Sequence, residues 1–204
     1  MKHFVLGILL IAGIVAPALA QGAPQQVRVR GTIAGLAGGV LTVNGLAGSS
    51  TKITLAPTYK VSYMVKSSLD KVAAGSYIGT AAEPQADGAL KAIEINIFPP
   101  GFKPGPGSHP WDLTPTSTMT NGTVDTIAAL KVEKADAHVL TVSYEGGSKQ
   151  VVVTPNATVV SYLPADASAL TAGAHVLVFA VKNADGNLVS GSISVGKDGL
   201  VPPM

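Results

Sequence analysis

An internal repeat is the feature that most constrains how this chain can fold. Four short motifs of the first half recur in the second half, in the same order and 98 or 99 positions later. They are VLTV at 40–43 and 139–142, Ser-Tyr at 62–63 and 161–162, Ala-Gly at 74–75 and 172–173, and Ala-Asp-Gly at 86–88 and 184–186. A constant offset of this kind predicts two copies of one structural unit, over about residues 27–98 and 119–197.

Both copies have the pattern of short β-strands. In the first copy, alternating or β-branched stretches such as VRVRGTI, VLTV and IEINI follow one another, and Gly, Pro, Asn or Asp separates them. Asp-Gly in both copies is typical of a tight hairpin turn, because these residues accept the positive φ angles that the turn needs. The only helical signals are single turns that end at Gly75 and Gly173.

Five or six short strands and one helical turn, in about 70 residues, indicate a small barrel of the OB type. We therefore expect an all-β protein with two tandem OB-like barrels, one for each repeat. The expected divisions are a signal peptide at 1–20, a first barrel at 21–98, a Pro/Gly-rich strap at 99–118, and a second barrel with a C-terminal tail at 119–204. A β-sandwich spread over both copies is the alternative architecture.

The first twenty residues predict export. Lys2 precedes an apolar run over residues 4–15, and Ala-Leu-Ala ends at Ala20. A charged start, a short apolar run and an A-x-A end are the signature of a bacterial Sec-type signal peptide, cleaved after Ala20. The run is shorter than the roughly 20 residues of a membrane-spanning helix. No later segment is apolar enough to span a bilayer, so we expect a soluble periplasmic or secreted protein.

Composition argues against several functional classes. The chain has no cysteine, which excludes disulfides, thiolate metal sites and cysteine nucleophiles. Its net charge is only +2, and the only tight basic pair is Arg28 with Arg30, so we expect no nucleic-acid partner. No nucleophile elbow, phosphate loop or carboxylate pair within an aromatic cleft is evident. These features predict a protein that is not an enzyme.

The stretch GPGSHPWDLTP, residues 105–115, joins the two repeats and holds the only tryptophan of the chain. Prolines stiffen it, and a free linker has no use for an indole. We therefore expect an ordered strap, with Trp111 and Leu113 buried as anchors and Asp112 capping a turn.

Histidines provide an alternative hypothesis. His109, Asp112, His138 and His175 are candidate ligands for zinc or copper, which prefer three or four converging nitrogen or oxygen donors. A soluble metal-binding accessory protein would use His109, Asp112 and one histidine of the second repeat. No regular spacing brings these residues together, so their convergence depends on the fold.

Four segments carry a resemblance to a known family. Residues 95–99, 109–113, 117–124 and 195–204 resemble a group of bacterial exported tandem-repeat proteins built from small β-barrels. The resemblance spans essentially the whole chain after residue 20, and it implies the fold and the export but no established activity. Together with the composition, it favours a non-catalytic binding or structural module whose partner is a periplasmic protein or an envelope component.

Overall fold

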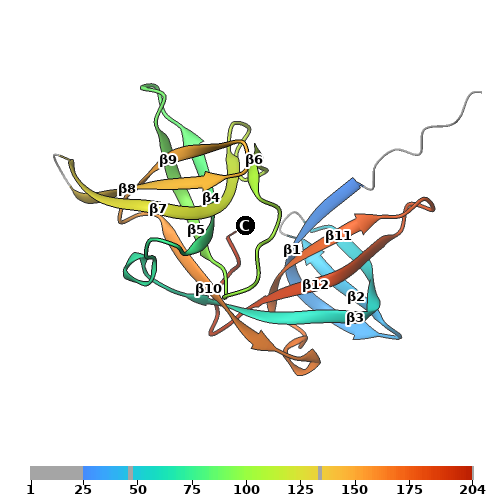
Figure 1. Ribbon diagram of the computed structural model, residues 1–204. Coiled ribbons are helices and arrows are strands. Elements are labelled where there is room, and N and C mark those ends of the chain that lie inside the picture. The colour runs from blue at the N-terminus through green and yellow to red at the C-terminus, as the bar shows by residue number, and fades with distance from the viewer. Residues whose placement is uncertain (1–24, 46–47, 133–134, 204) are drawn as a thin grey trace, which may run out of the picture.

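The computed structural model describes residues 25–45, 48–132 and 135–203 (Figure 1). In that part the chain is all-β, with two single 3-10 turns, η1 (Leu69–Lys71) and η2 (Ala167–Ala169), and no α-helix. The strands are β1 (Gln25–Ala37), β2 (Val40–Gly45), β3 (Ser50–Lys66), β4 (Tyr77–Pro84), β5 (Leu90–Ile97), β6 (Gly107–Pro110), β7 (Thr118–Val132), β8 (Ala135–Tyr144), β9 (Gly147–Val153), β10 (Thr158–Ala165), β11 (His175–Lys182) and β12 (Leu188–Gly196).

Five strands form a closed barrel, in the order β1-β2-β3-β12-β11 and back to β1. Only the β3–β12 pairing is parallel, with Val61 opposite Ile193. The β1–β11 pairing closes the ring, with Val29 opposite Val178. Alternate residues of these strands point inward, and they fill the barrel with Val, Ile and Leu side chains, including Leu41 and Ile53, which are fully buried.

A second ring of pairings joins β4, β7, β8, β9 and β5. Its shortest strand pairing is between β5 and β9, where Leu90 and Lys91 pair in parallel with Val151 and Val152. An apolar cluster lies inside this ring and includes the fully buried Ile78. The short strand β6 adds to the edge of β7 outside the ring.

The two rings exchange strands, which corrects the expected division of the chain. Residues 21–98 and 119–204 do not each close a barrel of their own. Instead β11 and β12, from the second half, complete the ring of β1–β3, and β4 and β5, from the first half, complete the ring of β7–β9. The sandwich alternative is wrong as well, because the strands of the first ring close into a barrel.

Two equivalent turns direct this exchange. Gly75, at the end of the first turn, donates its backbone N–H to the Val124 carbonyl of β7 at 2.8 Å. Gly173, its repeat counterpart, donates to the Ile33 carbonyl of β1, also at 2.8 Å. Each glycine therefore joins its own half to the first strand of the other half. Both have φ near +86° (+87° and +85°), a left-handed conformation that glycine adopts without steric cost.

The rings meet along a seam, where β10 pairs antiparallel with β3 on one side and parallel with β5 on the other. Figure 1 shows the two groups of strands as two lobes that meet where β3 and β10 cross. A third apolar cluster lies between the lobes. Its buried members come from five strands and the strap: Met64, Ala81, Trp111, Met119, Val160 and Leu177.

Residues 1–20, the predicted signal peptide, lie outside the described residues. Among the residues that are described, no helix is long and apolar enough to cross a membrane.

Candidate binding site at the seam

The strap between the two halves is an ordered part of the seam. Its strand β6 pairs with β7, and the backbone N–H of Trp111 donates to the Ser117 carbonyl at 2.8 Å. A tight turn over residues 114–117 follows, in which the Ser117 hydroxyl donates to the Thr114 carbonyl at 3.0 Å. The Trp111 side chain is buried, at 9% exposure, and Leu113 packs against the same cluster. The strap thus inserts its indole between the lobes, as an anchor requires.

Two arginines of β1 face this indole. Val29 points into the first barrel, so Arg28 and Arg30 on either side of it point outward, toward the seam. The Arg28 guanidinium lies over the Trp111 ring, with 3.6 Å between its central carbon and the ring centroid. Arg30 donates two hydrogen bonds to the carboxylate of Asp112, at 2.8 and 3.0 Å. A planar bidentate pair of this kind fixes both side chains.

We call Arg28, Arg30, Trp111 and Asp112 the seam cluster. The hydrogen bonds from Arg30, assisted by the charges of both arginines, hold the pKa of Asp112 below its usual range. Burial lowers the pKa of Arg28, although the nearby carboxylate opposes this effect. The sequence indicated Arg28 and Arg30 only as a basic pair, and Asp112 only as a turn residue and a candidate metal ligand. Their contact depends on where the strap crosses β1.

His109 borders the seam cluster. Its ring meets Trp111 edge-on, with the centroids 5.8 Å apart. Burial, and secondarily the positive charge of Arg28, lowers the pKa of His109. The neutral imidazole is therefore favoured at physiological pH.

A buried carboxyl group lies close by, at Glu94 on β5. The side chain is fully buried, and its Oε1 accepts a hydrogen bond from the Asn96 amide at 2.8 Å. The Tyr162 hydroxyl donates to the Asn96 side-chain oxygen, also at 2.8 Å. Glu94 Oε2 has no hydrogen-bond partner among the described residues. Burial raises the pKa of Glu94 to about 8, against smaller opposing effects of Asn96 and Arg30, so the neutral acid predominates at pH 7.

Sequence reasoning did not single out Glu94. The only local signal was its place in the alternating stretch IEINI, where Ile95 faces the core of the second ring. Alternation puts Glu94 and Asn96 on the opposite face. That face is nevertheless buried: Glu94 and Asn96 are both 0% exposed, and Asn96 accepts a hydrogen bond from Tyr162 of β10.

The candidate metal ligands do not converge. His109 lies opposite Met119, and His138 lies opposite Ala129 of the same strand, β7. Ten residues along a strand correspond to roughly 30 Å. His175 lies on β11, in the first barrel, and Asp112 is engaged by Arg30. In the described part of the chain, no three His, Asp or Glu side chains are grouped so that they could hold a metal ion.

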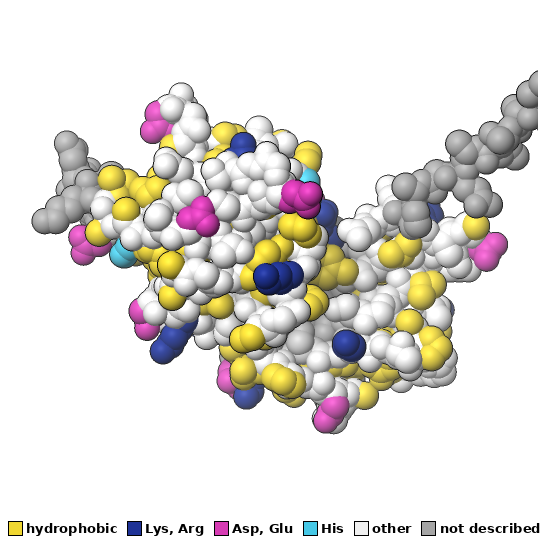
Figure 2. All heavy atoms as spheres, viewed as in Figure 1, with side chains coloured by type: hydrophobic (Ala, Val, Ile, Leu, Met, Phe, Trp, Pro, Cys, Tyr) yellow, Lys and Arg dark blue, Asp and Glu magenta, His cyan; other side chains and the backbone are white. Residues whose placement is uncertain are grey.

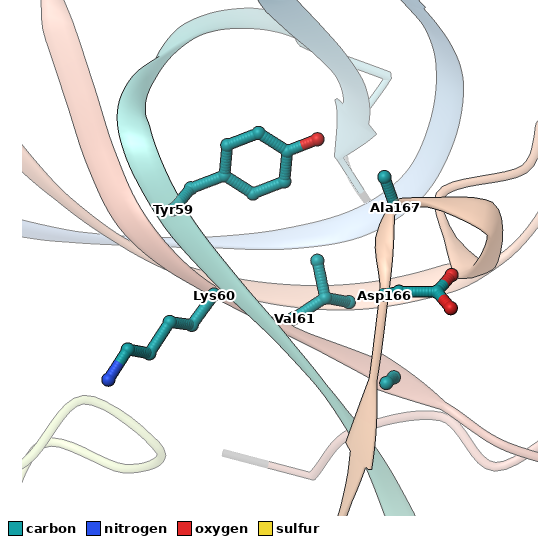
Figure 3. A pocket seen from close by; sticks show the side chains of 6 residues that line it. Tyr59, Lys60, Val61, Asp166 and Ala167 are labelled. Atoms are coloured by element: carbon teal, nitrogen blue, oxygen red, sulfur yellow. The ribbon is translucent and has the colours of Figure 1, made fainter.

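Two surface hollows are lined by residues other than those of the seam cluster. One, of about 500 Å³, lies between β3 and the segment that enters η2. In Figure 3, Tyr59 and Val61 point toward that segment, whereas the Lys60 side chain points away from it. The other, of about 450 Å³, is lined by residues 65–66 and 197–201. Neither hollow has a buried polar atom without a partner among its lining residues, so the seam cluster is the stronger candidate site.

The rest of the visible surface is sparsely charged. Figure 2 shows Lys, Arg, Asp and Glu side chains scattered singly over both lobes, without a large patch of either sign on that face. No protein-family model, curated protein or solved structure matches this chain. The functional argument therefore rests on the residues of the seam.

Proposed function

We propose that this protein is an exported, non-catalytic binding module of the bacterial periplasm. Two OB-like barrels, derived from two sequence repeats, are joined into one rigid unit that contacts a periplasmic protein or an envelope component at the seam. The observation that carries the proposal is the seam cluster. There, strand β1 and the strap place two arginines, a buried indole and a carboxylate in fixed contact.

The strand order supports the OB-like assignment. In the first barrel, three antiparallel strands, β1–β3, are followed around the ring by a strand parallel to β3 and a strand that returns to β1. This is the order of a five-stranded Greek-key barrel. The second ring has the same order when β7, β8 and β9 replace β1, β2 and β3. Barrels of this type commonly serve as binding modules.

The exchange of strands supports rigidity. Separate barrels on a flexible linker move independently, whereas these rings share main-chain pairing through β3, β10 and β5. The anchored strap adds a further tie at Trp111. A rigid pair binds a partner at a lower cost in conformational entropy, because its surfaces are already fixed relative to one another.

Export rests on the N-terminal signal and on the family resemblance. Sequencing the N-terminus of protein recovered from the periplasm tests it directly, and Gln21 is the expected first residue. Recovery of the uncleaved chain from the cytoplasm would contradict this part of the proposal.

Site-specific photo-crosslinking tests the binding function. A photoreactive amino acid replaces Thr116, an exposed residue of the strap, in cells that export the full chain. Thr54, an exposed threonine of β3, is the matched control. We expect a discrete adduct from position 116 and none from position 54. Absence of an adduct at 116, or the same adducts at both positions, would contradict partner binding at the seam.

A further inference from the structure

Arg28 has a longer contact with Asp112 than Arg30 has, at 3.6 Å against 2.8 Å. Its Nε is buried without a hydrogen-bond partner. The nearest carboxylate oxygen, Asp112 Oδ2, lies 3.6 Å from its Nη1, beyond ordinary hydrogen-bond length. The Arg28 side chain nevertheless keeps 20% of its surface exposed. Part of the side chain can therefore be reached from solvent.

The charges of the cluster do not balance. Arg28 and Arg30 carry two positive charges, and Asp112 supplies one negative charge in return. Glu94 is the other acidic group near Arg30, and as a buried neutral acid it contributes no charge at pH 7. One positive charge thus remains uncompensated at a partly buried position, where a further anion is electrostatically favoured.

The contact with Trp111 preorganises the Arg28 side chain for binding such an anion. The guanidinium carbon is 3.6 Å from the centroid of the indole, and this contact restrains the side chain, so it loses little additional freedom when it binds. The guanidinium fork matches the oxygen spacing of carboxylates and phosphates. Arg30 already uses this geometry within the cluster, on Asp112.

We infer that Arg28, held against Trp111, binds an oxyanion with at least two acceptor oxygens, either a carboxylate or a phosphate group of the partner. The neighbouring Arg30–Asp112 pair keeps the strap in place beside it. This inference rests on the proposed binding function and names the chemistry that the seam recognises.

Trp111 provides the assay, because it is the only tryptophan of the chain and contacts Arg28 directly. Sodium phosphate and sodium acetate are titrated separately into the full mature protein, with sodium chloride holding the ionic strength constant. We expect a saturable change in tryptophan emission and a rise in the melting temperature with one or both probes. The probe that binds more tightly distinguishes a phosphate partner from a carboxylate partner.

Three variants make the assay specific. Arg28→Gln should abolish saturation, and Arg28→Lys, which keeps the charge but loses the fork, should weaken binding about tenfold. Lys197→Gln is the matched control, since Lys197 is another cation near an aromatic ring, 5.6 Å from the centroid of Tyr63. It should bind like the parent. Because Arg28→Gln alters the surroundings of the fluorophore, calorimetric titration repeats the measurement, and circular dichroism checks the fold.

Two results would overturn the inference. One is an equal response to chloride alone, which would mark an adventitious ion only. The other is unchanged binding by folded Arg28→Gln protein. Failure of the broader proposal is distinguishable, because the crosslinking at position 116 tests the partner independently of free anions.

Discussion

Arg28 and Trp111 are in contact, with the guanidinium carbon 3.6 Å from the centroid of the indole. One residue belongs to the first strand of the chain, and the other belongs to the strap that leads into the second half. The contact therefore ties the first barrel to the strap between the lobes. Its importance for folding and for the seam can be measured by substitution.

Trp111→Ala should lower the free energy of unfolding by about 3 kcal/mol, the usual cost of truncating a large buried aromatic side chain. The indole is 9% exposed and packs against residues of both lobes. The surrounding side chains can therefore fill little of the cavity that the substitution leaves. Urea denaturation measures the loss. Phe102→Ala is the control, because this ring is 52% exposed and its truncation should cost below about 1 kcal/mol. Similar losses for both variants would contradict the anchoring role.

Glu94 should make the protein less stable as the pH rises from 4.5 to 8. Burial raises the pKa of Glu94 from 4.5 to about 8, so the folded state keeps a proton that the unfolded chain releases near 4.5. The stabilisation linked to this proton is complete below pH 4.5 and is lost as the pH approaches 8, at up to about 1.4 kcal/mol per pH unit.

Glu94→Gln removes that titration and keeps a neutral side chain of the same size. The variant should show a flatter dependence of unfolding free energy on pH between 5 and 8, measured by urea denaturation at several pH values. Glu145→Gln, at an exposed position, should follow the parent. If Glu94→Gln has the slope of the parent, Glu94 does not titrate in this window.

The strand exchange predicts which cysteine pairs can form a disulfide, and the chain has no cysteine to interfere. Gln26 of β1 lies opposite Val181 of β11. Neighbouring antiparallel residues have Cα atoms about 4.5–5.5 Å apart, within the range of a disulfide. The double variant Gln26→Cys/Val181→Cys should oxidise to an intrachain crosslink, detected by mass spectrometry.

Glu83 is the repeat counterpart of Val181, 98 positions earlier, and it lies on β4 in the other ring. The pair Gln26→Cys/Glu83→Cys is therefore the control, and it should stay reduced. Preferential crosslinking of 26 with 83 would instead mean that each repeat closes its own barrel.

Gly122 should be intolerant of any side chain. A Cβ added there would lie 2.4 Å from the Ser143 carbonyl oxygen on the paired strand. Relief requires movement of the backbone, so Gly122→Ala should cost about 2–3 kcal/mol in thermal or urea unfolding. At Gly191, on β12, an added Cβ would have no atom within 4 Å. Gly191→Ala should therefore change the free energy of unfolding by less than about 0.5 kcal/mol. Equal tolerance at the two sites would contradict the close approach of β7 and β8.

Local features of the fold follow directly from the sequence. The positive φ of Gly75 and Gly173, and the hairpins at the Asp-Gly pairs, depend on conformations that few other residues adopt. The buried position of Trp111 accords with the presence of a single indole among prolines. The turns involve neighbours within a few residues, so composition and spacing are sufficient to predict them, whereas the residues that bury Trp111 come from distant strands.

The candidate site is less accessible to sequence reasoning. Arg28, Arg30 and Asp112 were visible as charges, but their contact joins segments far apart in the chain. Glu94 lies in an ordinary alternating strand, and that local pattern does not indicate that its side chain is fully buried. The three histidines were considered together as metal ligands because the chain has so few of them. In the structure they lie at widely separated strand positions.

By itself, the sequence determined the all-β class and the places where the chain turns, because alternation and turn chemistry are local properties. Only the tertiary structure decided which repeat completes which barrel. Val124 and Ile33 occupy equivalent positions and offer the same carbonyl to the glycine that follows a turn. The local pattern is identical for either pairing, so the choice lies in long-range contacts. Those contacts also create the seam, where strands and strap bring charges together that no local pattern connects.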